Sequence, residues 1–310
     1  MGDTEYNNRV KWIDTAKGIG IICVILGHLY VPVAYAYIYS FHVPLFFFLS
    51  GYLFNNKYSF RDFLKRKVRG LIIPYFCLGI PLIFISSILE SDGFSFDSLF
   101  KYFIKLIINQ RLYTLWFLTC LFALEIFFYF FNKSIKNLYI QILISLVGCI
   151  IVLIYYEIGG KCWLWNIDLS IMALFFYIIG YAFKRKQIFE NYIIKHKVVC
   201  IIITGAWVLG TFVNGHLFNT VLDMYNNKYG VFVISYIVAI LGIIIVCCVS
   251  RYIKVDFIGY IGKNSLIYFA WHGSIGFRIM DFICGKFGLF DKTIDAMTVS
   301  YTHLTLPTIA

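Results

Sequence analysis

Charged residues are scarce in this chain. Only 14% of its 310 residues are Asp, Glu, Lys or Arg, whereas 61% are apolar and 20% are aromatic. A soluble domain carries about 25% charged residues and about half apolar ones, so this sequence could not cover a water-facing surface. Disordered chains and coiled coils need more charge or a heptad pattern, and the same figures exclude them. The class that remains is a polytopic membrane protein.

Cysteine forms no framework here, although nine cysteines are present. Two of them, Cys162 and Cys284, fall near expected loops. The others lie in apolar runs, where a thiol behaves as a small hydrophobic group: Cys23, Cys77, Cys120, Cys149, Cys200, Cys247 and Cys248. We therefore expect neither a disulfide nor a metal site.

Apolar windows long enough to cross a bilayer recur along the chain. About 20 helical residues, each rising 1.5 Å, cover roughly 30 Å of hydrocarbon. The sequence predicts an all-α polytopic membrane protein with about nine transmembrane helices in one domain over residues 1–298. The expected spans are 19–36, 41–54, 71–89, 112–131, 138–156, 167–183, 198–213, 231–250 and 264–283.

Most of the 27 lysines and arginines fall in alternate connections between these spans. This asymmetry follows the positive-inside rule and places the N-terminus in the cytoplasm. The net charge of +11 therefore orients the protein, and we expect no binding of nucleic acid. Abundant Ile, Phe, Tyr, Lys and Asn suggest an AT-rich bacterial genome, so we expect a multi-pass protein of a bacterial inner membrane.

The last dozen residues differ in character from the rest of the chain. Residues 299–310 resemble the translation of a sequencing adapter joined to a truncated gene, and we exclude them from the fold as an artefact. On this interpretation the natural protein continues past Thr298 and has a tenth span. The alternative is a genuine polar tail.

Ionisable residues in the first apolar segment are functional candidates, because such groups are costly inside hydrocarbon. Eleven residues separate Lys17 from His28. On a helix they rise about 16 Å and end within about 20° of whole turns, so both side chains face one stripe. A neutral imidazole can take a proton from an alcohol, as acyl transfer to a hydroxyl requires. Asp14 joins this set by holding the Lys17 ammonium and capping the helix; the alternative for His28 is a histidine that only packs helices.

A basic cluster precedes the third expected span. Arg66 and Arg69 lie three residues apart, just before Gly70 and Pro74. On an α-helix this spacing presents two guanidinium groups on one face, which suits the phosphates of a nucleotide-like donor such as a coenzyme A thioester. The alternative is a topogenic cluster that contacts anionic lipid headgroups.

Several motifs occur in a fixed order. Lys17 and His28 form an Arg/Lys-x10-His pattern, and Arg66 and Arg69 form Arg-x-x-Arg. Shorter ones are Phe41-His-Val-Pro with Ser50-Gly51, Leu115-Trp116-Phe117-Leu118, Trp165-Asn-Ile-Asp168 and Ser265-Leu-Ile-Tyr-Phe-Ala-Trp-His272. Together, over about residues 12–283, they resemble the integral membrane acyltransferase 3 family, and most closely its fucose 4-O-acetylase-like sugar O-acetyltransferases.

The resemblance implies an enzyme with ten spans, a membrane O-acyltransferase and most simply an O-acetyltransferase. Its donor would be a cytoplasmic acyl-CoA, usually acetyl-CoA, acting as co-substrate rather than as a bound cofactor. Its acceptor would be a hydroxyl of a surface or lipid-linked carbohydrate, and its environment the lipid bilayer. The resemblance assigns catalysis to His28 with Lys17, and donor binding to Arg66 and Arg69.

Three further residues are weaker candidates for contact with the acceptor. His42, beside Pro44, assists or orients the acceptor or merely caps a short helix. Trp116 stacks on a sugar ring or anchors the chain at the interface. His272 lies one turn from Tyr268 in the ninth expected span.

Two carboxylates in or near the spans are also candidates. Asp168 and Glu125 each position an acceptor hydroxyl or hold a protonated His28. The equally weighted alternative is a structural ion pair with Arg278 or Lys17.

A carrier or flippase for a lipid-linked sugar or small solute is the alternative function. Midplane ionisable residues would then line a pathway without chemistry. The lack of a detectable inverted repeat and the one-sided arginine cluster argue against it. We expect an acetyl donor and direct transfer; a succinyl donor and an acyl-histidine intermediate are alternatives that the sequence does not exclude.

Overall fold

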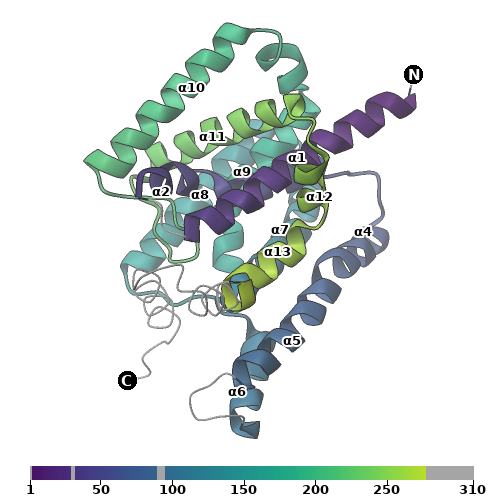
Figure 1. The fold of residues 1–310 in the computed structure, drawn as a ribbon, viewed down its shortest axis with the longest axis vertical. Coiled ribbons are helices and arrows are strands. Elements are labelled where there is room, and N and C mark those ends of the chain that lie inside the picture. The colour runs from purple at the N-terminus through teal and green to yellow at the C-terminus, as the bar shows by residue number, and fades with distance from the viewer. Residues whose placement is uncertain (1, 29–31, 89–94, 277–310) are drawn as a thin grey trace, which may run out of the picture.

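The computed structural model describes residues 2–28, 32–88 and 95–276, and these residues are predominantly helical (Figure 1). The longer helices are α1 (Gly2–His28), α5 (Ile73–Ile88), α6 (Phe96–Ile108), α7 (Trp116–Ser134), α8 (Leu138–Glu157), α9 (Ile167–Arg185), α10 (Lys197–Phe212) and α11 (Phe232–Tyr252). The shorter ones are α2 (Pro32–Tyr39), α3 (His42–Leu53), α4 (Phe60–Lys67), α12 (Asp256–Lys263) and α13 (Ser265–Trp271).

Tighter and wider helical turns join these helices. The 3-10 turns are η2 (Tyr113–Leu115) and η3 (Leu164–Asn166), and the π-helical turns are η1 (Val68–Ile72), η4 (Phe189–Ile193), η5 (Val213–Leu217) and η6 (His272–Gly276). Among the described residues, β-structure consists of an isolated antiparallel bridge between Asp223 and Lys228. The predicted all-helical fold class is therefore confirmed.

Seven helices among the described residues are long and apolar enough to cross a membrane. They are Ala34–Leu53, Phe60–Ile85, Trp116–Ser134, Leu138–Glu157, Leu164–Arg185, Val198–Leu217 and Phe232–Tyr252. These seven overlap the second to eighth predicted spans, so the predicted count of nine is not confirmed. Part of the ninth predicted span and all of residues 299–310 lie outside the described residues.

The first predicted span, 19–36, falls on two helices among the described residues. α1 ends at His28, and α2 begins at Pro32. Proline is favoured in the first turn of a helix and cannot continue one from the preceding turn, because it lacks the backbone N–H and its ring clashes with that turn. His28 is the last described residue of α1, and residues 29–31 lie outside the described part of the chain.

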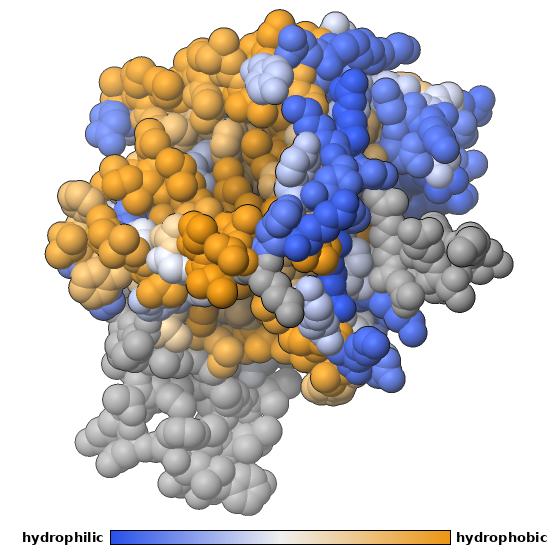
Figure 2. Space-filling view, turned by 90° about the horizontal axis from the view of Figure 1, so that it is seen from above, coloured by the Kyte–Doolittle hydropathy of each residue, from blue (hydrophilic) through white to orange (hydrophobic). Residues whose placement is uncertain are grey.

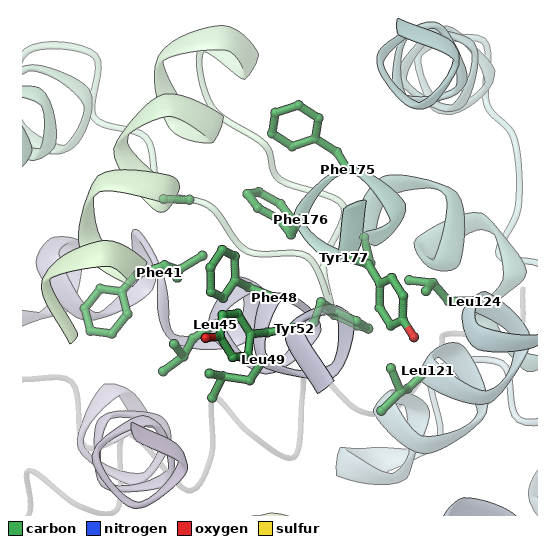
Figure 3. Close-up of a cluster of buried hydrophobic side chains, with 14 of the residues drawn as sticks. Phe41, Leu45, Phe48, Leu49, Tyr52, Leu121, Leu124, Phe175, Phe176 and Tyr177 are labelled. Carbon is green, nitrogen blue, oxygen red and sulfur yellow. The ribbon is translucent and has the colours of Figure 1, made fainter. Parts of the chain in front are cut away.

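The core is centred on the contact between α3 and α9 (Figure 3). α3 carries Phe48 and α9 carries Tyr177, both fully buried. A Cβ atom at Gly51 would overlap the carbonyl of Tyr177, and one at Gly180 would overlap the carbonyl of Phe48. Only glycine permits this backbone approach, which is the small-residue packing common between membrane helices. The two helices consequently form one tightly packed unit.

Other helices expose apolar side chains at the periphery. Large exposed side chains include Ile73 and Phe84 on α5, Ile151 on α8 and Ile201 on α10. In Figure 1, α4, α5 and α6 lie to one side of the other helices. Figure 2 shows hydrophilic residues gathered in a band on the viewed face, with hydrophobic residues over much of the rest. Such apolar surfaces suit contact with lipid.

Candidate active site

Lys17 and His28 lie on one uninterrupted helix. α1 continues without a break between them, so the expected rise of about 16 Å applies. Both side chains are half-buried. Asp14 lies one turn before Lys17 and interacts electrostatically with Lys17 and Lys263. α1 packs against α12, where Gly262 approaches the backbone of Asp14, and also against α3, α11 and α13.

Three histidines from distant parts of the chain converge at the His28 end of α1. The ring centroids of His28 and His272 are 5.0 Å apart. His42 interacts electrostatically with both of them. The three residues come from the end of α1, the start of α3 and the start of η6. We call His28, His42 and His272 the histidine cluster.

Backbone hydrogen bonds orient two rings of this cluster. Nδ1 of His42 lies 2.9 Å from the carbonyl oxygen of Ile38, and Nδ1 of His272 lies 2.8 Å from that of Phe269. A carbonyl oxygen can only accept, so each Nδ1 carries the proton and donates it. In a neutral ring the other nitrogen, Nε2, then holds a lone pair that can accept a proton. In their neutral form His42 and His272 are therefore both the tautomer that carries its proton on Nδ1.

A second group of polar side chains lies toward the other end of α1, in a pocket of about 490 Å³. Lys17, Arg66, Lys67 and Glu125 supply its charged groups. The rest of the lining is Ser50, Leu53, Phe54, Asn55, Tyr58, Phe63, Gly70, Leu71 and Leu121. We call this the basic pocket, because three cationic side chains and a single carboxylate line it.

The two arginines of the Arg-x-x-Arg motif are placed differently. Arg66 lines the basic pocket, and its guanidinium lies 4.1 Å from the ring centroid of Tyr58. Both arginines are exposed, but Arg69 does not belong to the pocket lining. Arg69 lies in the π-helical turn η1, whose wider i to i+5 hydrogen bonding shifts the faces that three-residue spacing brings together on an α-helix.

Among the described residues, each carboxylate candidate forms an ion pair with a cation other than Lys17. Glu125 pairs with Lys67, whose Nζ lies 2.7 Å from Oε1. Asp168 pairs with Arg111, again at 2.7 Å. A pair with Lys17 is therefore wrong for both, because each carboxylate has a nearer cation, and Arg278 lies outside the described residues.

Arg111 is the centre of a buried polar network that the sequence reasoning missed. Its guanidinium donates to Asn166 Oδ1 at 2.9 Å, Asn227 Oδ1 at 2.7 Å and the Tyr225 carbonyl at 3.0 Å, and the Tyr156 hydroxyl donates to Asp168. Burial opposes the charge of Arg111, but Asp168 and the neighbouring acceptors outweigh it, and the pKa of Arg111 lies above its ordinary value. One feature of the sequence could have pointed to this network. Arg111 lies in a connection that the positive-inside rule predicts to contain few cations.

Trp116 packs beside this network. Its side chain is 4% exposed and its ring lies 6.2 Å from that of Tyr225. Its carbonyl accepts a hydrogen bond from Asn166. Within the described part of the chain Trp116 and Asp168 thus belong to interior packing and lie apart from the lining of the basic pocket.

Comparison with known proteins identifies a family that matches this chain. The sequence profile of a family described as an acyltransferase domain, acyltransferase 3, matches residues 10–291, which include the histidine cluster and the basic pocket. The match confirms the family resemblance and favours an enzyme over a carrier or flippase; the fucose 4-O-acetylase-like likeness stays a prediction. No curated protein and no solved structure matches the chain.

Proposed function

Since the chain belongs to the acyltransferase 3 family, and is therefore an acyltransferase with membrane helices, we propose that it is a membrane O-acyltransferase. It transfers an acyl group, most simply acetyl, from acyl-CoA to a hydroxyl of a surface or lipid-linked carbohydrate. The observation that carries this proposal concerns two residues of α1. Lys17 lines the basic pocket, and His28 lies beside His272.

The basic pocket is the proposed donor site. Lys17 and Arg66 bind the phosphates of the donor, because ammonium and guanidinium groups form strong charge-assisted hydrogen bonds with phosphate oxygens. By the positive-inside rule this end of α1 faces the cytoplasm of a bacterial inner membrane, where acyl-CoA is available. The rise of about 16 Å to His28 is comparable with the length of an extended pantetheine arm.

The histidine cluster is the proposed reaction centre. His28 accepts the proton of the acceptor hydroxyl as its oxygen attacks the thioester carbonyl. The carbon–sulfur bond then breaks, and the departing coenzyme A thiolate takes the proton from the His28 imidazolium. His42 and His272 orient the acceptor, because their Nε2 atoms accept hydrogen bonds from hydroxyls next to the one that reacts. Asp168 and Trp116 take no direct part in this reaction. Their replacement would reduce transfer by disturbing the packing around Arg111.

Transfer in membrane vesicles tests the proposal. Inverted vesicles containing the protein receive radiolabelled acetyl-CoA and the host's own glycans. His28→Ala should lower the label reaching carbohydrate by about 10²- to 10⁴-fold, the usual contribution of a general base, while membrane insertion is unchanged. His196→Ala is the matched control, because this exposed histidine makes no side-chain bond at the start of α10.

Two outcomes would contradict the proposal. Equal transfer by the His28→Ala and His196→Ala proteins would remove His28 from the chemistry. If the purified wild-type protein does not bind acetyl-CoA, acetyl-CoA is excluded as the donor and O-acetylation as the reaction.

A further inference from the structure

The basic pocket contains a lysine outside the recognised motifs. Lys67 ends α4 between the two motif arginines, and its side chain lines the pocket with Lys17 and Arg66. Its ammonium lies 2.7 Å from Glu125 of α7. The Lys67 side chain is 28% exposed whereas that of Glu125 is 3% exposed, so the pair is buried on its acidic side and open on its basic side.

Aromatic packing fixes the position of Lys67. Phe63, one turn earlier on α4, is buried, and its ring lies 4.9 Å from that of Tyr129 on α7. The Tyr129 hydroxyl donates to the carbonyl of Tyr58, just before α4. The Lys67 ammonium lies 5.3 Å from the Phe63 ring centroid. α4 is therefore docked on α7 at the level of Glu125, which holds the ammonium at the pocket wall.

The charges of the pocket favour an anion beside Lys67. Lys17, Arg66 and Lys67 are three cations facing one carboxylate. Lys67 also repels Lys17 electrostatically. Glu125 is already committed to Lys67, so it leaves a positive excess at the mouth of the pocket, and a polyanion would relieve the repulsion.

We propose that Lys67 is a further donor-binding residue, which contacts a phosphate of acyl-CoA, and that Glu125 is a positioning residue acting through Lys67. This inference rests on the proposed function. It assigns the third cation of the donor site to Lys67, which lines the pocket, in addition to Lys17 and Arg66.

Steady-state kinetics in vesicles tests the assignment, with acetyl-CoA as the varied substrate. Lys67→Met should raise the KM for acetyl-CoA about tenfold with little change in kcat, because one charge-assisted hydrogen bond to the donor is lost. Lys65→Met, which removes an exposed lysine of the same helix outside the pocket lining, is the matched control.

A double variant separates donor binding from a structural role. Glu125→Leu should raise the KM less than Lys67→Met does, and Lys67→Met/Glu125→Leu should keep the KM of Lys67→Met, because Glu125 acts through Lys67. The double variant removes the buried unpaired carboxylate, so it should also unfold at a higher temperature than Lys67→Met alone. A double variant with the wild-type KM would show a purely structural pair and overturn the proposal.

Two further outcomes would also overturn it. If wild-type protein transfers acetyl groups but Lys67→Met has the KM of Lys65→Met, the assignment fails while the proposed function stands. If the KM effect occurs in vesicles containing phosphatidylglycerol and vanishes in pure phosphatidylcholine, Lys67 binds a lipid headgroup. Absence of transfer by the wild-type protein would reject the proposed function itself.

Discussion

Two ion pairs of equal length, each with a buried carboxylate, have different surroundings in this protein. Lys67–Glu125 and Arg111–Asp168 both measure 2.7 Å. The Arg111 side chain is 9% exposed and its guanidinium also donates to Asn166, Asn227 and Tyr225. The Lys67 side chain is 28% exposed and lines a pocket, with Glu125 as the ion-pair partner of its ammonium.

The difference shows how one interaction serves two purposes. Hydrogen-bond donors that are already occupied by protein acceptors stabilise a particular arrangement of loops, and here they join η3, α8 and the segment before α11. An ammonium that keeps donors directed at a pocket can bind a ligand. Arg111 should therefore affect stability, and the basic pocket should affect donor affinity.

Arg111→Met should have the largest effect and should sharpen this contrast. It leaves Asp168 buried without its cation, so we expect a loss of about 3–5 kcal/mol in the free energy of unfolding. Thermal unfolding of the detergent-purified protein measures this loss. Lys161→Met, at an exposed lysine near the same loops, is the control. Equal melting temperatures for the two variants would contradict a structural role for Arg111.

Arg66→Met should have an intermediate effect, and that effect should be on donor affinity rather than on stability. It removes a guanidinium from the donor pocket, so we expect the KM for acetyl-CoA to rise about tenfold at nearly unchanged melting temperature. Initial rates at varied acetyl-CoA concentration measure the change. A large fall in melting temperature with an unchanged KM would place Arg66 with Arg111 and break the comparison.

Arg69→Met should have the smallest effect of the three. Arg69 is exposed and does not line the pocket, so its loss weakens only the long-range attraction of the anionic donor. We expect the KM to rise less than about threefold, and the difference from wild type to disappear at high salt. An effect as large as that of Arg66→Met, insensitive to salt, would show that Arg69 contacts the donor directly.

Local patterns explain which parts of the site were predictable from the sequence. Lys17 and His28 share an uninterrupted helix, so helical arithmetic alone was sufficient to relate them. The same arithmetic failed for Arg66 and Arg69, because the π-helical turn η1 changes the periodicity and no residue type marks it.

Contacts between distant segments were not predictable in the same way. His272 was a candidate from its own span, but its approach to His28 depends on how α13 packs against α1. The partners of Glu125 and Asp168 likewise depend on the docking of α4 on α7 and of the Arg111 loop on α9. Of the fold, the helical class and seven spans followed from apolar windows, whereas the start of α2 at Pro32, inside the first predicted span, did not.

The continuity of α1 makes this helix a molecular ruler for the donor. Because no hinge separates Lys17 from His28, the interval between the phosphate site and the base is fixed at eleven residues. One inserted residue would lengthen the interval by about 1.5 Å and turn His28 by about 100° away from the face of Lys17. An activated acyl donor whose phosphate lies next to its acyl group, such as an acyl phosphate, would be too short to occupy both ends.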